Sequence, residues 1–260
     1  MAAIDFQVSL RRRYRGHVTR SLLDPLRQCA LEIGEAIAGQ RRQGYSGRRA
    51  TQYYVDLTAD DVALRVLTGA GFRVVSEESG ITGEGEFTVV VDPIDGSTNC
   101  DRGIPFYATS LAVMKDDEIV AGLVMNQATG TVFEAERGAG ATRDGVAIAP
   151  SGVTAVAGSI MAFSGLPSRH LGWAQYRALG AASLEICLVA DGSLDVYGVA
   201  QRSTLNPWDY LAGLLILREA GGVAADYRDE DLDTSTAVVR RPVFCASREL
   251  LDFMLSVGVI

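Results

Sequence analysis

The run from residue 89 to residue 99, Val-Val-Val-Asp-Pro-Ile-Asp-Gly-Ser-Thr-Asn, constrains the fold of this chain more than any other stretch. An apolar strand leads directly into Asp92 and Asp95, and a glycine and two hydroxyl residues follow. Carboxylates at the end of a buried strand are unfavourable unless a positive group lies between them, and a divalent metal ion is the simplest such group. Hydroxyls and free backbone N–H groups directly after the carboxylates suit a phosphate. The run therefore predicts a metal-assisted phosphate site.

The turn inside this run brings several oxygen atoms together. Pro93 fixes its own φ and lacks an N–H donor, which leaves the Ile94 carbonyl free to point with the carboxylates. Hard cations such as Mg²⁺ take oxygen ligands of this kind. Gly96 allows the sharp turn, and Ser97 and Thr98 open a segment whose N–H groups can hold phosphate oxygens. The alternative is an Asp-rich turn in which Ser97 is a helix N-cap.

The composition argues against several other chemistries. The chain has 260 residues, enough for one large domain or two tightly packed halves, and its net charge of −8 argues against a broad nucleic-acid or membrane surface. Its single lysine, Lys115, lies in a predicted hairpin turn, outside any phosphate-binding Gly-x-x-x-x-Gly-Lys motif. His17 lies in a basic stretch and His170 in a polar loop, which is a poor basis for a Ser-His-Asp triad. Carboxylate chemistry remains as the strongest option.

Several features predict a cytoplasmic protein. Arg11–Arg13 are not followed by the apolar segment of a secretory signal, and we interpret this basic arm as a flexible end rather than a nucleic-acid binder. The chain lacks a run of about 18 apolar residues, so we expect no membrane span. The cysteines are far apart in sequence, which fits a reduced compartment and argues against structural zinc. They are Cys29, Cys100, Cys187 and Cys245.

The chain divides into two patterns near residue 150. The first half, 1–150, begins with helices predicted over 22–38 and 56–67 and continues as antiparallel strands at 109–114, 119–126 and 131–136. The second half, 151–260, alternates strands and helices, which indicates a layered α/β arrangement. We expect the halves to share one extensive interface, with most metal ligands in the first. The elements predicted for the second half are strands at 159–163, 194–199 and 243–246 and helices from 181, from 207 and over 248–257.

Two further acidic elements accompany the opening run. Glu77 and Glu78 follow a predicted strand at 72–76, just before a Gly-rich loop at 80–86, and such pairs are usually solvated. Asp209 lies in Asn-Pro-Trp-Asp at 206–209, where Asn206 is a plausible N-cap and the first helical turn favours an anion. Read alone, Asp209 is as well explained by the helix dipole as by a metal.

Together the three elements closely resemble the inositol monophosphatase superfamily of Mg²⁺-dependent phosphatases, from about residue 22 to the end. The motifs are Asp-Pro-Ile-Asp-Gly-Ser-Thr-Asn at 92–99 and Trp-Asp-x-x-Ala-Gly at 208–213. The stretches at 77–80 and 102–105 resemble the archaeal-type members, which often act on inositol monophosphate and fructose 1,6-bisphosphate. The resemblance implies an αβαβα sandwich, commonly a homodimer. It also implies two or three Mg²⁺ ions, with Mn²⁺ as a possible substitute.

The resemblance also implies roles for individual residues. Asp56 matches the aspartate that orients the attacking water, together with Ser97, which stands where the family usually has Thr. Glu78 would lie beside the metal ligands. Phosphate and substrate contacts would come from Gly96, Ser97, Thr98 and the segment Gly180, Ala181, Ala182. The implied metal ligands are Glu77, Asp92, the Ile94 carbonyl, Asp95 and Asp209.

One departure leaves the substrate open. Family members often carry an acidic residue, and archaeal types an Asp-x-Arg, where this chain reads Gly-Val-Ala at 198–200, although Arg202 is nearby. A site that lacks a polar partner discriminates poorly for the matching hydroxyl. The first hypothesis is a phosphatase for a small sugar or polyol phosphate. The alternatives are a phosphatase for nucleotide 3′-phosphates or histidinol phosphate, and a non-catalytic binding protein on the same fold.

Overall fold

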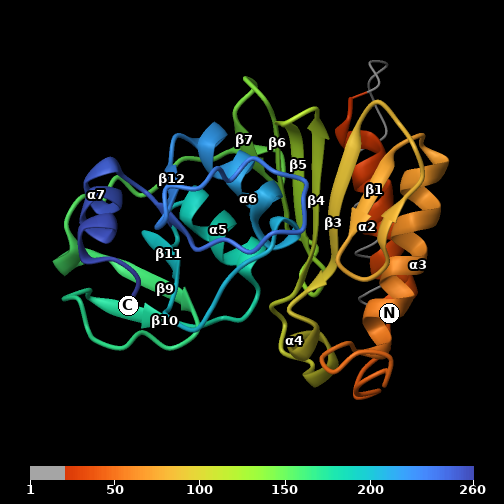
Figure 1. Cartoon of the computed structure of the whole chain (residues 1–260), viewed down its shortest axis with the longest axis horizontal. Coiled ribbons are helices and arrows are strands. Elements are labelled where there is room, and N and C mark those ends of the chain that lie inside the picture. Colours follow the sequence, from red (N-terminus) through yellow and green to blue (C-terminus); the bar gives the residue numbers. More distant parts are fainter. Residues whose placement is uncertain (1–20) are drawn as a thin grey trace.

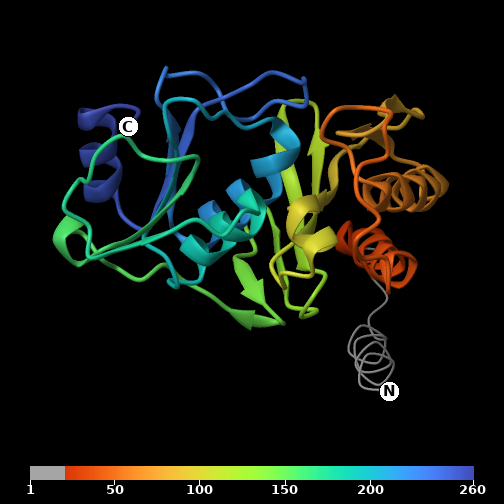
Figure 2. The same ribbon diagram turned by 90° about the horizontal axis from the view of Figure 1, so that it is seen from below.

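The computed structural model describes residues 21–260, in which helices and sheets alternate as layers. α2 (Leu23–Ile37) and α3 (Tyr54–Gly69) cover the outer face of one sheet, and α5 (Ala182–Ala190) and α6 (Pro207–Ala220) lie between this sheet and a second one (Figure 1). α7 (Arg248–Val257) covers the outer face of the second sheet. The same layers follow one another in the perpendicular view (Figure 2). This is the predicted αβαβα sandwich.

The first sheet has eight strands in the order β2-β1-β3-β4-β5-β6-β7-β8. β1 and β3 are parallel, and the other neighbours are antiparallel, which confirms the predicted meander. β2 lies within the segment that the sequence predicts as a Gly-rich loop, so that prediction is wrong at its start. The strands are β1 (Arg73–Ser76), β2 (Gly80–Thr82), β3 (Thr88–Asp95), β4 (Ala108–Lys115), β5 (Glu118–Asn126), β6 (Val132–Glu136), β7 (Ala141–Arg143) and β8 (Val146–Ala147).

The second sheet has five strands in the order β10-β9-β11-β13-β12. β9 is parallel to β10 and β11, and β13 is antiparallel to β11 and β12. A short 3₁₀ turn, η1 (Val156–Gly158), precedes this sheet. Its strands are β9 (Ile160–Ser164), β10 (Gln175–Arg177), β11 (Val196–Val199), β12 (Val223–Asp226) and β13 (Pro242–Cys245).

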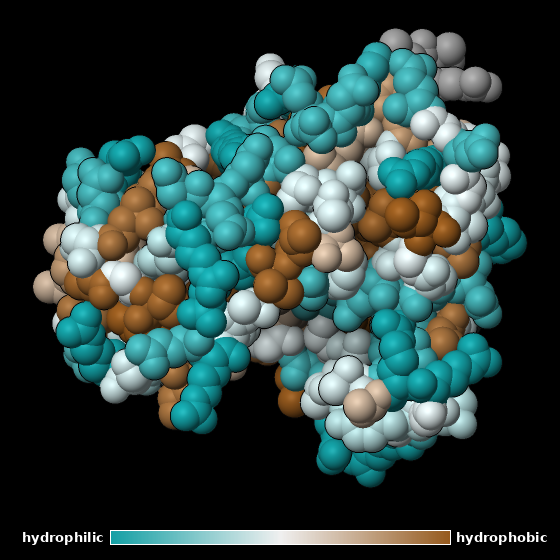
Figure 3. Space-filling model, in the orientation of Figure 1, coloured by the Kyte–Doolittle hydropathy of each residue, from teal (hydrophilic) through white to brown (hydrophobic). Residues whose placement is uncertain are grey.

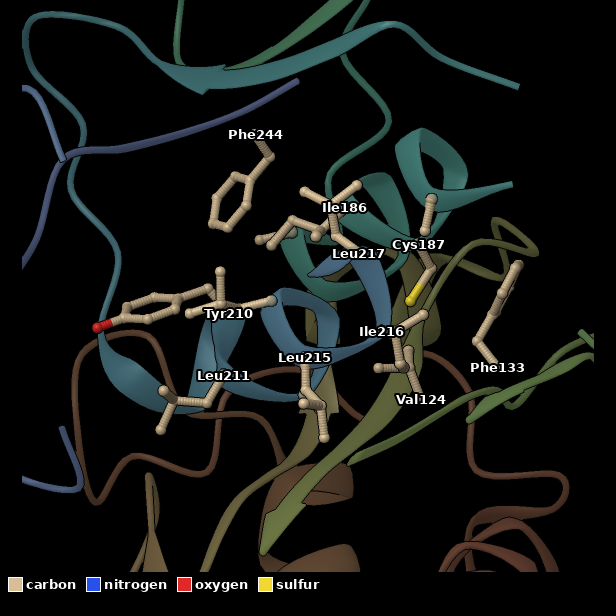
Figure 4. Packing of buried hydrophobic residues seen from close by; sticks show 14 of the residues in the cluster. Val124, Phe133, Ile186, Cys187, Tyr210, Leu211, Leu215, Ile216, Leu217 and Phe244 are labelled. Atoms are coloured by element: carbon tan, nitrogen blue, oxygen red, sulfur yellow. The ribbon is translucent and has the colours of Figure 1, made fainter. Parts of the chain in front are cut away.

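Helix α6 packs between the sheets because residues 210–217 are uncharged, mostly apolar and buried on all sides. The ring centroids of Tyr210 and of Phe244 in β13 lie 6.4 Å apart, while Leu215 faces the first sheet (Figure 4). The helix lies so close to β5 that a Cβ atom on Gly122 would be 3.0 Å from the carbonyl oxygen of Ala212. This packing fixes the N-terminal end of α6, and with it Asp209, against the first sheet.

The part of the chain that the structure describes contains no helix long and apolar enough to cross a membrane. The basic stretch Arg11–Arg13 and His17 lie outside the described residues.

Candidate active site

Two parallel strands bring the first acidic residues together. β1 and β3 pair with Ser76 opposite Val91, so the residue after Ser76 comes next to the residue after Val91. The backbone N–H of Glu77 donates to the Val91 carbonyl oxygen at 3.2 Å, which holds Glu77 beside Asp92. Asp209 reaches the same place from the first turn of α6. One carboxylate oxygen from each of Glu77, Asp92 and Asp209 lies within 4.8 Å of the other two.

The electrostatics of these three carboxylates fit a divalent cation. Burial, followed by repulsion from Asp209 and Glu78, raises the pKa of Glu77 to about 8. Burial likewise raises the pKa of Asp209 to about 7 and holds the pKa of Asp92 well above its usual range. The Oδ1 atom of Asp92 is buried and has no hydrogen-bond partner among the described residues. A buried, unpartnered carboxylate oxygen beside two further carboxylates is the donor set that a hard cation takes.

Asp209 is oriented by the start of its own helix. Asn206 is the N-cap and Pro207 the first helical residue, as predicted, and the Asn206 backbone N–H donates to Asp209 Oδ2 at 2.6 Å. This capping box fixes the side chain of Asp209. Gly221, in the left-handed conformation, caps the other end of α6.

Asp95 lies at the end of β3 and binds the beginning of α5. Its carboxylate accepts from the N–H groups of Ala182 (3.1 Å) and Ser183 (2.7 Å) and from the Ser183 hydroxyl (2.5 Å). Asp95 is not one of the three clustered carboxylates. The Ile94 carbonyl oxygen accepts from the Ser97 hydroxyl at 2.9 Å. The roles of Asp95 and the Ile94 carbonyl as metal ligands therefore stay predictions.

The turn after β3 approaches the second half of the chain closely. Gly96, not Ser97, is the N-cap of α4 (Ser97–Arg102), so the alternative with Ser97 as N-cap is wrong. Gly96 has a φ of +88°, and a Cβ atom there would lie 3.0 Å from the Gly180 carbonyl oxygen. Only glycine meets both conditions without strain. Thr98 is held by a 3.1 Å hydrogen bond between its hydroxyl and that of Tyr53.

Asp56 projects from the first turn of α3 toward this turn. Its Oδ2 atom accepts from the Tyr53 backbone N–H at 2.7 Å, while its buried Oδ1 atom has no hydrogen-bond partner within residues 21–260. Burial raises the pKa of Asp56 to about 6, and the Ser97 hydroxyl lies close to its carboxylate. The structure thus brings Asp56 and Ser97 together. Their role in orienting water stays a prediction.

Glu78 contacts the loop between α2 and α3. Its carboxylate accepts from the Arg49 guanidinium and the Gln52 side-chain amide. Arg49 also donates to the backbone carbonyls of Glu77 (3.2 Å) and Glu78 (2.9 Å). Glu78 therefore contacts the loop that borders the site.

A cavity of about 310 Å³ lies beside Asp95 and Asp209. The molecular surface is hollowed between the part that carries α4 and the part that carries β9 and β10 (Figure 3). Arg202 is exposed and does not line the cavity. The cavity is lined by Asp95, Phe163, Ser164, Gly165, Ala178, Gly180, Ala181, Ala182, Glu185, Tyr197, Leu205 and Asp209.

Comparison with known proteins identifies the family. Residues 50–255 match the model of the inositol monophosphatase family. The chain belongs to the inositol monophosphatase family. Fructose-1,6-bisphosphatase of Pyrococcus furiosus is 39% identical over 210 residues, which cover 78% of this chain and 81% of the relative. Fructose-1,6-bisphosphatase/inositol-1-monophosphatase of Methanocaldococcus jannaschii is 32% identical over 250 residues, covering 86% and 97%.

The solved structures agree with this assignment. A crystal structure described as an inositol monophosphatase–fructose 1,6-bisphosphatase superposes with a TM-score of 0.80 at 27% identity, covering 91% of this chain and 99% of that one. Family membership confirms the predicted enzyme class, a phosphoric monoester hydrolase. The family's metal dependence agrees with the acidic cluster.

Sequence reasoning missed one carboxylate of this family member's cavity. Glu185 is buried in α5, and its carboxylate accepts from the N–H groups of Leu179 (3.1 Å) and Gly180 (3.3 Å). It thereby fixes the loop whose Gly180 carbonyl approaches Gly96. The sequence does contain a signal for Glu185, because it is the single acidic residue in the otherwise apolar segment 184–190. A charged residue that is buried needs specific partners, so its position there indicates a defined role.

Proposed function

We propose that this chain hydrolyses the phosphate monoester of a small sugar or polyol, with Mg²⁺ held by Glu77, Asp92 and Asp209. The observation that carries the proposal is the meeting of these three carboxylates, one of which, Asp92, has a buried oxygen with no hydrogen-bond partner among the described residues. The water-orienting pair Asp56 and Ser97 and the cavity lie next to them. Metal ligands, a polar group for water and a space for the alcohol are the parts that such a hydrolysis needs.

The metal-binding part of the proposal includes further residues. Asp95 and the Ile94 carbonyl would add oxygen ligands for two or three Mg²⁺ ions, and Mn²⁺, which takes the same ligand types, would substitute. When bound, the metal supplies Lewis acidity and lowers the pKa of a coordinated water. Glu78 would support Glu77 through its contacts with Arg49 and Gln52.

The protein groups then orient water and phosphate. The Ser97 hydroxyl donates its proton to the Ile94 carbonyl, so its oxygen is left to accept a hydrogen bond from water. The free Oδ1 of Asp56 accepts a second one. The N–H groups of Ser97 and Thr98 follow the Gly96 turn and would hold the negatively charged phosphate oxygens in place.

Relatives support the substrate class. The two curated relatives are named for fructose 1,6-bisphosphate and inositol 1-phosphate, which favours a sugar or polyol phosphate over the nucleotide 3′-phosphate or histidinol phosphate alternative. Gly180, Ala181 and Ala182 line the cavity where the alcohol would bind. Contact with Arg202, a homodimer, a cytoplasmic location and the division of the chain at residue 150 stay predictions.

A panel of phosphate esters with and without Mg²⁺ tests the proposal. We expect inositol 1-phosphate or fructose 1,6-bisphosphate to release phosphate only with the metal, and adenosine 3′,5′-bisphosphate and histidinol phosphate to react more slowly.

Asp92→Asn should lower kcat/KM by more than about a hundredfold, because a metal ligand contributes several kcal/mol to such chemistry. Asp117→Asn, an exposed turn substitution, is the matched control. Metal-independent phosphate release, or Asp92→Asn with the activity of the control, would contradict the mechanism. Absence of any phosphate release would favour the non-catalytic binding protein.

A further inference from the structure

A second buried acid of α3, Asp60, lies one helical turn after Asp56. Its Oδ1 atom accepts hydrogen bonds from the hydroxyls of Ser76 (2.5 Å) and Ser79 (3.2 Å). These serines flank Glu77 and Glu78 on either side. The Ser76 hydroxyl oxygen also accepts from the Glu78 backbone N–H at 3.1 Å. A single carboxylate oxygen therefore ties both ends of the turn that carries Glu77.

This turn is bound from two directions by groups of different solvent exposure. Arg49 holds the carbonyls of Glu77 and Glu78 from the loop between α2 and α3, and its side chain is 49% exposed. Asp60 holds the turn from inside a packed helix and is 6% exposed. Hydrogen bonds to a buried acceptor are stronger than those at the surface, where water competes. Asp60 is thus the more rigid of the two supports.

A support is needed because Glu77 faces like charges. Asp92 and Asp209 lie within 4.8 Å of it, and repulsion between carboxylates at this distance favours turning one of them away. We propose that Asp60 is a positioning residue for the metal site, and that it holds the Ser76–Ser79 turn so that the Glu77 carboxylate faces Asp92 and Asp209. This inference rests on the proposed function, since it takes these three carboxylates as metal ligands.

Mg²⁺ binding without substrate tests the role of Asp60 directly. In Asp60→Ala, which removes the acceptor, we expect the Mg²⁺ dissociation constant from calorimetry to rise about tenfold, as is typical when a group that orients a metal ligand is lost. In Asp60→Asn, which keeps an acceptor oxygen but removes the charge, we expect most of the affinity to return. At saturating Mg²⁺, kcat of both variants should stay close to that of the unaltered protein.

Controls separate this role from charge and from folding. Asp61→Ala removes the same charge from the next, exposed residue of α3 and should leave the dissociation constant unchanged. Ser76→Ala removes the same hydrogen bond from the serine side and should also weaken Mg²⁺ binding. This variant keeps the test available if Asp60→Ala fails to fold. Equal losses in Asp60→Asn and Asp60→Ala would show a charge effect and overturn the proposal, as would unchanged binding in Asp60→Ala and Ser76→Ala. If the unaltered protein binds no Mg²⁺, the proposed function itself fails; if it binds Mg²⁺ but releases no phosphate, the Asp60 result remains readable.

Discussion

Gly96 shows how much of the site depends on one backbone position. Its left-handed φ disfavours any side chain, and a Cβ atom would meet the Gly180 carbonyl at 3.0 Å and the Phe106 carbonyl at 3.2 Å. Gly96→Ala should therefore destabilise the fold by about 1–3 kcal/mol and lower phosphate release by at least tenfold, because α4 must move away from Gly180. Urea denaturation and phosphate-release assays would measure the two effects.

Gly103→Ala is the matched control for that substitution. Gly103 has a similar φ of +76°, but a Cβ atom there would meet only the flexible end of the Arg41 side chain, at 3.3 Å. The two variants share the conformational strain and differ in the close approach to backbone. Equal effects of the two substitutions on activity would show that the Gly96–Gly180 contact does not position the site.

For single residues, the sequence predicted a role where the neighbouring residues in the chain determine it. The residues around Asp92 indicated a metal site by themselves, whereas Asp209 was assigned as a ligand only through the family resemblance. Asp60 and Glu185 could not be assigned from the sequence, because their partners are distant in the chain and only the tertiary fold brings these groups together. The contact of Asp95 with Ala182 and Ser183 escaped prediction for the same reason.

Among the elements, α6 depends most on close packing. Gly122 of β5 allows this helix to approach, since a Cβ atom would lie 3.0 Å from the Ala212 carbonyl oxygen. Alanine normally suits a strand interior better than glycine. A lower unfolding free energy in Gly122→Ala would therefore be caused by the close contact with Ala212. Gly122→Ala should cost about 1–3 kcal/mol of unfolding free energy in urea denaturation. Gly69→Ala, where a Cβ atom has no described neighbour within 4 Å, should be neutral or slightly stabilising. Similar values for both variants would contradict the close-packing account.

Elements with long periodic patterns could be predicted closely, and short ones could not. The amphipathic pattern of α2 and the capping residues of α6 gave their bounds to within a residue or so. β7 and β8 have three and two residues and β10 has three, which is too short for a period-2 pattern to emerge. Their pairing is fixed by neighbouring strands rather than by their own side chains.

For the whole molecule, the acidic cluster joins the two sheets. Glu77 and Asp92 lie in the first sheet, directly after β1 and within β3, while Asp209 lies in the first turn of the helix packed between the sheets. The layered arrangement was predicted from the family resemblance, since composition and periodicity indicate elements but not their stacking. A metal bound by these three residues would connect both parts of the chain, so its binding free energy should add to the stability of the entire fold.

This connection makes stability depend on both pH and Mg²⁺. Burial raises the pKa of Glu77 from 4.5 to about 8 and that of Asp209 from 3.8 to about 7. Because the folded state holds these protons more tightly than the unfolded state, the resulting stabilisation is full below about pH 4 and is lost as pH rises to about 8. Mg²⁺ needs the deprotonated carboxylates and competes with the protons. In EDTA the melting temperature should therefore fall between about pH 4 and pH 8. The increase in melting temperature produced by Mg²⁺ should grow as pH rises toward 8, because the folded-state carboxylates lose their protons over that range.

Two variants identify the groups behind this pH dependence. Asp92→Asn should abolish the Mg²⁺-induced increase in melting temperature at every pH, because it removes the central ligand. Glu185 also has a pKa raised by burial, to about 7, but it lies outside the three-carboxylate cluster. Glu185→Gln should therefore flatten the pH dependence in EDTA and leave the Mg²⁺ increment unchanged. An increment that is the same at low and high pH in the unaltered protein would mean that protons and metal do not share these carboxylates.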